Sequence, residues 1–180
     1  MLQQMNKFGV SIMIGYVLLI GMAVVMGGVM YAWMKSYVPQ SDIECPEGVS
    51  LVINDYVYNC SNSTLNITLK NNGRFDIAGY YIKVTNNSEQ TIATTDISTN
   101  LINTGGSMYK YSYAVLFKAG NENSFNPNNE TQNLFDVSKI TNGVKRIEII
   151  PVRWQKENNK LRFVGCGETT KFKESIVCSD

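Results

Sequence analysis

The residues of this 180-residue chain with the clearest chemistry are its four cysteines, Cys45, Cys60, Cys166 and Cys178. The chain has no histidine, so a zinc site would need all four thiolates, and the paired C-x2-C spacing of zinc knuckles is missing. Disulfides are the better interpretation, and they indicate an oxidising compartment outside the cytoplasm. Three pairings are possible. We favour Cys45–Cys60 and Cys166–Cys178, because each closes a short loop worth about 3 kcal/mol in the chain-entropy model.

Asparagine offers a second kind of chemistry, because several asparagines begin Asn-x-Ser/Thr sequons without proline. N-linked glycans would suit an exported surface, since their polarity keeps such a surface soluble. The chain is rich in asparagine, serine and threonine, so we expect at least two of these sequons to be accidental. The acceptor residues are Asn59, Asn62, Asn66, Asn86 and Asn129.

Catalysis has little support in the sequence. Without histidine, the commonest general base is absent, which leaves lysine or carboxylate chemistry. Ser107 and Lys110 match the S-x-x-K motif of acyl enzymes, but they lie in an alternating, strand-like stretch and no K-T-G partner exists. The stretch "GNENSFNPNNE" (120–130) gathers oxygen ligands but lacks the aspartate-rich spacing of a calcium loop. We therefore predict that the chain is not an enzyme and that it holds no metal or cofactor.

The element that organises the chain is an uncharged, mostly apolar run between Lys7 and Lys35. As a helix it would measure roughly 40 Å, enough to cross a hydrocarbon core of about 30 Å. An ordinary secretory signal has an apolar stretch of only about 7–15 residues followed by a small-x-small cleavage site, and "YAWMKSYVPQ" offers no such site. Two interpretations remain, a permanent anchor and a helix that packs against copies of itself.

The spacing within the run favours packing. Methionine recurs every fourth residue, and two small-xxx-small pairs would let helix backbones approach closely. The alternative is a lipid-facing helix whose glycines have no special role. The predicted packing residues are Met22, Ala23, Met26, Gly27, Gly28, Met30, Ala32 and Met34.

The junction "NKFG" followed by "VSIMIGYVLLI" resembles the class III signal of archaeal type IV pilins and archaellins. In that family a prepilin peptidase cuts after the small residue and the apolar helix stays on the mature protein. The resemblance implies cleavage between Gly9 and Val10. The chain departs from the family pattern at Phe8, where a second basic residue is usual, and at Ile12, where many of these pilins have proline. The resemblance also implies a precursor inserted in the membrane. The partners that it implies are an assembly ATPase, a membrane platform protein, and copies of this chain or related pilins.

The remainder of the chain has a different texture. Alternating stretches such as "LNITLKNNG" and "VKRIEIIPVRW" predict strands separated by turns. The chain carries a formal charge of +1. Two lysines before residue 41 contribute +2, so the remainder carries about −1 and does not suggest nucleic acid binding. We expect an antiparallel sandwich, and the pilin resemblance implies an immunoglobulin-like one. The predicted core is Leu65, Ile67, Leu69, Tyr81, Val84, Leu116, Ile147, Ile149, Val152, Trp154, Leu161 and Phe163.

The predicted organisation is thus α+β: a class III signal peptide (1–9), a hydrophobic helix (10–38) and an extracellular β-sandwich (41–180). Two functions stay open. The first is a structural pilin-like subunit of an archaeal type IV pilus or archaellum-like filament. The second is a single-pass, membrane-anchored surface protein for adhesion or binding, which is not assembled. Cleavage between Gly9 and Val10 distinguishes them, because only the first function requires it.

Overall fold

The structure, a computed structural model, describes residues 7–37, 44–102, 109–157, 159–169 and 171–179. The chain divides into two compact units, Met1–Asp42 and Ile43–Asp180. The described part of the first unit is one α-helix, and the described part of the second contains strands, turns and two short 3-10 helices. The predicted α+β class, with one N-terminal helix and antiparallel sheets, is confirmed.

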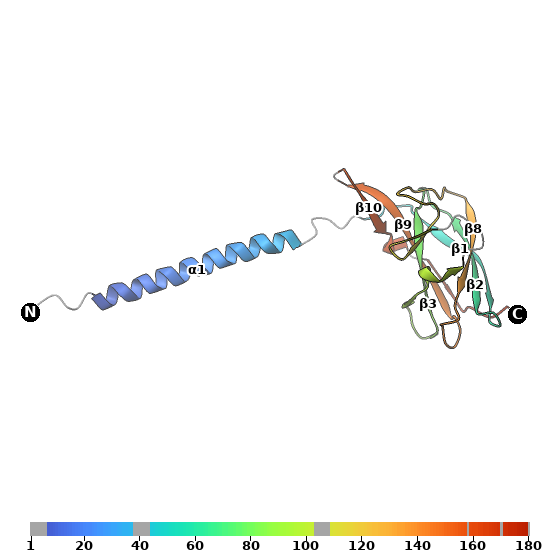
Figure 1. The fold of residues 1–180 in the computed structure, drawn as a ribbon, viewed down its shortest axis with the longest axis horizontal. Coiled ribbons are helices and arrows are strands. Elements are labelled where there is room, and N and C mark those ends of the chain that lie inside the picture. Colours follow the sequence, from blue (N-terminus) through green and yellow to red (C-terminus); the bar gives the residue numbers. More distant parts are fainter. Residues whose placement is uncertain (1–6, 38–43, 103–108, 158, 170, 180) are drawn as a thin grey trace, which may run out of the picture. The chain divides into compact units, whose positions relative to one another are not determined.

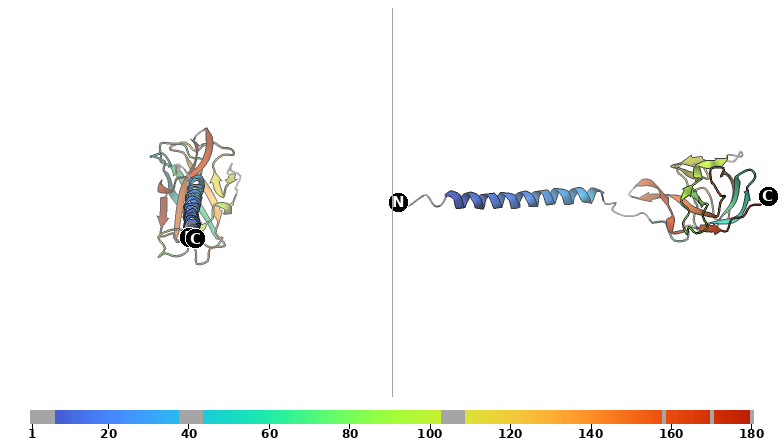
Figure 2. Two further views of the ribbon diagram at one scale, coloured as in Figure 1. Left: turned by 90° about the vertical axis from the view of Figure 1, so that its left-hand side faces the viewer. Right: turned by 90° about the horizontal axis from the view of Figure 1, so that it is seen from below.

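Helix α1 (Lys7–Tyr37) is a single straight helix (Figures 1 and 2). It contains no proline, and proline is a principal cause of sharp helix kinks. Several valines and glycines lower its intrinsic helix propensity. In an apolar environment, however, the backbone must satisfy its own hydrogen bonds, which strongly favours a helix. The helix ends two residues before Pro39, which cannot continue the hydrogen-bond ladder.

The second unit contains two antiparallel sheets. The smaller sheet has four strands in the order β1-β2-β8-β5. Strand β2 lies between β1 and β8 and alternates between buried and half-buried residues, as a strand with one face in the core must. The bounds are β1 (Leu51–Asn59), β2 (Thr64–Asn71), β8 (Glu130–Asp136) and β5 (Leu101–Ile102).

The larger sheet has seven strands, with β10-β9-β3-β7-β6 as its continuous path. Two short strands complete it: β11 pairs with the first part of β9, and β4 pairs with the end of β3. The bounds are β3 (Gly79–Thr85), β4 (Thr95–Asp96), β6 (Tyr109–Tyr111), β7 (Ala114–Leu116), β9 (Arg146–Glu157), β10 (Lys160–Gly165) and β11 (Lys171–Glu174). The 3-10 helices are η1 (Ser98–Asn100) and η2 (Gly167–Thr169).

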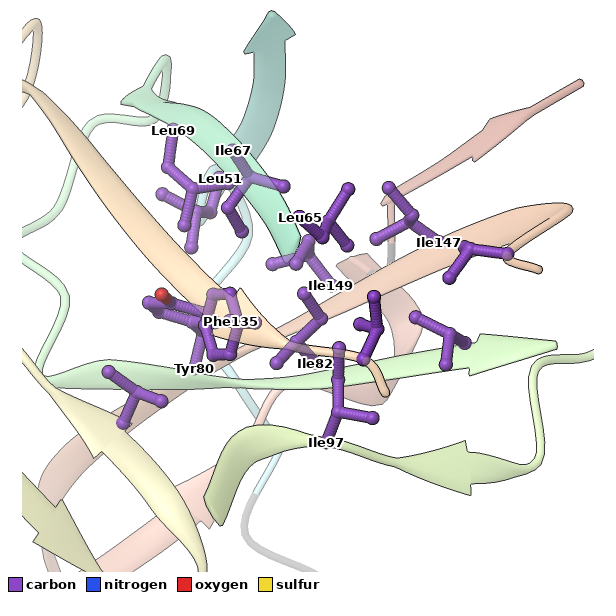
Figure 3. Close-up of a cluster of buried hydrophobic side chains, with 14 of the residues drawn as sticks. Leu51, Leu65, Ile67, Leu69, Tyr80, Ile82, Ile97, Phe135, Ile147 and Ile149 are labelled. Carbon is purple, nitrogen blue, oxygen red and sulfur yellow. The ribbon is translucent and has the colours of Figure 1, made fainter. Parts of the chain in front are cut away.

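Both sheets contribute to one hydrophobic core (Figure 3). Leu65, Ile67 and Leu69 of β2 and Phe135 of β8 come from the smaller sheet. The larger sheet supplies Tyr80 of β3 and the buried aliphatic residues Ile82, Val84, Ile147 and Ile149. Because each side chain of this size stabilises the fold by about 1.5–3 kcal/mol when buried, this core is the main source of stability of the second unit.

Most of the predicted core residues are buried: Leu65, Ile67, Leu69, Val84, Leu116, Ile147, Ile149, Val152 and Trp154. The prediction that Leu161 lies in the core was wrong, because this residue is 47% exposed on the edge strand β10. Tyr81 is only half-buried, and its neighbour Tyr80 is fully buried instead. Adjacent strand residues face opposite sides of a sheet, so the pattern located β3 correctly but assigned the wrong tyrosine to the core. Phe163 is half-buried and packs in a small cluster with Trp154 rather than in the main core.

The structure pairs Cys45 with Cys166 and Cys60 with Cys178, and no described cysteine is free. All four cysteines therefore form disulfides, but the predicted pairing was wrong. Cys45 and Cys60 precede and follow β1, whose nine residues separate its ends by about 30 Å at 3.3 Å each. A disulfide needs Cα atoms about 4.4–6.8 Å apart, and the observed separations are 5.4 and 5.6 Å. Strand formation thus excludes the short-loop pairing.

Candidate anchor and assembly helix

From Met13 to Tyr37, α1 is mostly apolar, with Lys35 as its one charged residue, and none of this segment is buried within the chain. This segment has 25 residues and contains an 18-residue window with a mean hydropathy of 2.2, so by length and composition it is able to cross a membrane. A membrane anchor and a signal sequence both fit this description. Exposed apolar surface of this extent has to be covered by lipid or by other protein. The helix is therefore the part of the molecule that requires a partner.

The predicted packing residues lie on this exposed surface. The four methionines are between 59% and 69% exposed. At Gly27 and Gly28, a Cβ atom would meet no other heavy atom within 4 Å, and the same is true at Gly15 and Gly21. The glycines therefore serve no packing purpose inside the single chain. Their positions are open for close approach by another helix.

A feature that the sequence did not predict is centred on Gly21, six residues before Gly27, although Met22 and Met26 beside it were predicted packing residues. An open apolar groove of about 430 Å³ is centred on Gly21 and lined by Val17, Leu18, Met22, Val25 and Met26. The absence of a side chain at Gly21 leaves a gap between the larger residues before and after it. The sequence pattern that predicts such a groove is a glycine with large apolar residues three and four positions away, because residues at these spacings are neighbours on a helix surface. The groove has the form of a hole into which a side chain of a neighbouring helix can insert.

Aromatic and basic residues gather at the end of α1. The Lys35 ammonium lies 5.6 Å from the centre of the Tyr31 ring, and the Trp33 and Tyr37 rings are 5.1 Å apart. The Ser36 hydroxyl donates a hydrogen bond of 2.7 Å to the Trp33 carbonyl, so the hydroxyl makes its polar contact within the helix. Aromatic rings and a lysine with a long apolar stem suit the headgroup level of a bilayer.

The predicted processing junction, Gly9–Val10, lies within the first turns of α1, which begins at Lys7. Cleavage there requires the start of the helix to open. Helix ends fray at low free-energy cost, so this opening is feasible. Processing itself remains a prediction.

The sequons differ in accessibility. Asn62, Asn86 and Asn129 are exposed, whereas Asn59 and Asn66 are half-buried. Asn66 lies in the middle of β2, whose backbone is paired on both sides. The Asn86 side-chain amide donates a hydrogen bond of 2.9 Å to the carbonyl of Thr141, and this nitrogen is the atom that would carry a glycan. Asn62 and Asn129 are therefore the most accessible acceptors.

The motifs weighed for catalysis or metal binding show ordinary structural contacts where they are described. Ser107 lies outside the described residues, and Lys110 is in strand β6. In the 120–130 loop, Glu122 pairs with Lys118 at 2.7 Å, and that lysine lowers the pKa of the Glu122 carboxyl. Glu130 pairs with Lys70 at 3.1 Å. Within the described part of the chain, no three His, Cys, Asp or Glu residues gather where they could hold a metal ion.

No family model, no curated protein and no solved structure matches this chain.

Proposed function

We propose that this protein is a pilin-like structural subunit of a cell-surface filament, assembled through α1. The observation that carries the proposal is the unburied helix, uncharged between Lys7 and Lys35, whose glycines are open to a neighbour. A bundle of such helices would bury this apolar surface. A helix without charge can leave lipid for a protein bundle at little cost, because both surroundings are apolar.

The globular unit fits the surface of such a filament. Its two disulfides suit an oxidising location outside the cytoplasm, and its exposed sequons suit glycosylation. We further propose that its two antiparallel sheets form an immunoglobulin-like sandwich, with the shared core between them. By resemblance to archaeal type IV pilins and archaellins, the partners would be a prepilin peptidase, an assembly ATPase, a membrane platform protein and other pilins.

The second candidate is a single-pass surface protein that keeps its anchor. The apolarity of α1 between Lys7 and Lys35 supports this alternative too, because a helical segment without a polar face is suited to lipid on all sides. In that case the globular unit would act alone, by binding a ligand or a neighbouring cell.

Processing separates the two. We expect the mature protein, isolated from its native envelope, to begin at Val10 when its intact mass and N-terminal peptide are measured. Gly9→Leu should leave an uncleaved precursor in the membrane, because a bulky residue replaces the small one before the scissile bond. Gly15→Leu is the matched control, since it adds the same side chain six residues beyond the junction, and its mature mass should increase only by the substitution. A precursor that is never cleaved in the unmodified protein would favour the anchored surface protein.

A further inference from the structure

An open hollow of about 440 Å³ lies on the outer face of the larger sheet, lined by Tyr81, Asp96, Thr99, Ser112 and Tyr113. It occurs where β3 changes partner. The start of β3 pairs with β7, and its end pairs with β4. Between these pairings, Ile82 bonds to the segment around η1 instead: its N–H donates to the Ser98 hydroxyl at 2.9 Å, and its carbonyl accepts from the Ile97 N–H at 3.0 Å. The break in strand pairing explains the position of the hollow.

The polar groups of the hollow are held in place. The Tyr81 hydroxyl donates to the Ser112 carbonyl at 3.3 Å. Burial raises the pKa of Tyr81, the Ser112 bond opposes this effect, and the Asp96 carboxylate adds to it. The Tyr81 hydroxyl is thus protonated at neutral pH, and its oxygen can still accept a hydrogen bond. One oxygen of Asp96 accepts the Ser98 N–H at 2.8 Å, and a carboxylate has further acceptor positions.

The turn that brings Tyr113 to the hollow is strained. Ser112 and Tyr113 form the two-residue loop between β6 and β7, with φ angles of 48° and 67°. Positive φ at both positions is the type I′ form of such a loop, which prefers Asn-Gly. Asn142 and Gly143, in the connection before β9, also have positive φ, and both residue types tolerate it.

Tyr113 is nevertheless 75% exposed, so it contributes little packing in return for the strain. The turn is fixed by the strand before it, because the Tyr111 ring lies 5.4 Å from both the Trp154 and Phe163 rings. These contacts also show that the larger sheet curls, since β6 and β10 are at opposite ends of its strand order. A strained residue held in position by its surroundings is a feature of ligand sites.

We propose that this hollow binds a neutral pyranose sugar. An aromatic ring such as that of Tyr113 can pack against the C–H face of a pyranose. The Asp96 carboxylate would accept hydrogen bonds from sugar hydroxyls, and the lining hydroxyl groups would complete them. The volume lies within the range of small-molecule sites.

The charges around the hollow favour a neutral ligand over a cation. Lys83 is directly opposite Asp96 in the pairing of β3 with β4, so both side chains emerge on the same face. The positive charge of Lys83 on this face of the sheet disfavours a positively charged ligand. The proposed site does not depend on filament assembly, because it lies wholly within the second unit.

Saturation-transfer NMR on the full chain in lipid nanodiscs, produced without glycosylation, tests the site. The probes are neutral methyl hexopyranosides and methyl N-acetylhexosaminides. We expect at least one to bind, with saturation of its ring C–H protons. Tyr113→Gly should weaken binding about fivefold, because the stacking surface is lost, while Tyr113→Phe keeps the ring and should stay within about twofold. Because glycine suits this turn, loss of binding in Tyr113→Gly will not reflect misfolding.

Asp96→Asn should weaken binding about tenfold, since charge-assisted hydrogen bonds are lost. Asp55→Asn is its matched control: Asp55 is exposed, it accepts a neighbouring backbone N–H at 2.8 Å from Tyr56, and it lies in β1 of the other sheet. This control should bind normally. The proposal is overturned if no glycoside binds, if Tyr113→Gly binds as the unmodified chain does, or if tetramethylammonium occupies the site in preference to every sugar.

The sugar can belong either to another cell or to a glycosylated copy of this chain. Light scattering of the glycosylated protein distinguishes the two sources. Association that the bound methyl glycoside reverses would support the site and assign its ligand to a neighbouring copy. Absence of association, with the glycoside still bound, would support the site and assign its ligand to an external glycan.

Discussion

Cys45 is disulfide-bonded to Cys166, which lies 121 residues further along the chain. The second bond, Cys60–Cys178, spans 118 residues, and the two loops overlap. If Cys45–Cys166 is absent, the Cys60–Cys178 bond still connects Cys45 to Cys166 by a short covalent path. That path runs 15 residues from Cys45 to Cys60 and 12 residues from Cys178 back to Cys166. The same path applies when the other bond is removed. Each bond is therefore partly redundant in constraining the unfolded chain.

Removing one disulfide should accordingly cost less than its loop length suggests. For Cys45→Ser with Cys166→Ser, the relevant loop has about 27 residues, and the chain-entropy model gives a loss of about 3.5 kcal/mol in the free energy of unfolding. Cys60→Ser with Cys178→Ser should cost a similar amount. Replacing all four cysteines should cost about 8 kcal/mol, because the second loss opens a loop of more than 100 residues. Denaturant unfolding of the full chain in nanodiscs, followed by Trp154 fluorescence in a Trp33→Phe background, measures these values. A quadruple variant no less stable than either double variant would contradict the model.

Assembly through α1 should fail when its small residues are enlarged. Gly27→Leu with Gly28→Leu raises hydrophobicity and helix propensity, and the added side chains meet nothing within the chain. Membrane insertion and processing should therefore survive. Packing should be lost, because leucine at a close backbone contact separates the helices and removes their dispersion contacts. Electron microscopy should show no filaments.

The matched control is Val24→Leu with Val29→Leu, which adds apolar volume at two exposed positions without filling a small-residue site. This variant should assemble. Normal filaments from the double-glycine variant would refute the packing role of Gly27 and Gly28. Failure of both variants would show that the helix surface as a whole, rather than its small residues, determines assembly.

Glycan occupancy should follow accessibility. We expect Asn62 and Asn129 to be modified, since both are exposed and lie outside strands. Asn66 should be unmodified, because β2 holds it between two paired strands. Glycopeptide mass spectrometry of the native protein measures the occupancy of each site. Asn62→Gln should remove one glycan mass, and Asn66→Gln, the matched control, should remove none. A fully glycosylated Asn66 would show that modification precedes folding of the sheet.

The turn at Tyr113 should be a site where stability and binding conflict. The backbone at position 113 is left-handed, which is unfavourable for tyrosine but not for glycine. Tyr113→Gly should therefore increase the free energy of unfolding by about 0.5–1 kcal/mol. For a domain of this size, that gain corresponds to a rise in melting temperature of roughly 2–4 °C. Differential scanning calorimetry measures it. Asn142→Gly is the control, because asparagine already tolerates this conformation and the change should be small. A lower melting temperature for Tyr113→Gly would show that the tyrosine stabilises the fold.

The sequence by itself determined the features that depend on local pattern. The uncharged run after Lys7 predicted a helix long enough to span a membrane, since length and composition suffice for that conclusion. Alternation in β2 identified Leu65, Ile67 and Leu69 as core residues, because a strand has a side-chain period of two. The absence of histidine and of C-x2-C spacing was enough to predict disulfides rather than zinc.

Only the tertiary structure decided which distant residues meet. The partner of Cys45 is Cys166 because β1 separates Cys45 from Cys60 and the sheets bring the end of β10 beside it. Leu161 is exposed because β10 is an edge strand, which its own alternation does not reveal. The hollow between Tyr81, Asp96 and Tyr113 exists because β3 changes partners and the larger sheet curls. Strand pairing is a non-local property, so a pattern within one segment cannot specify it.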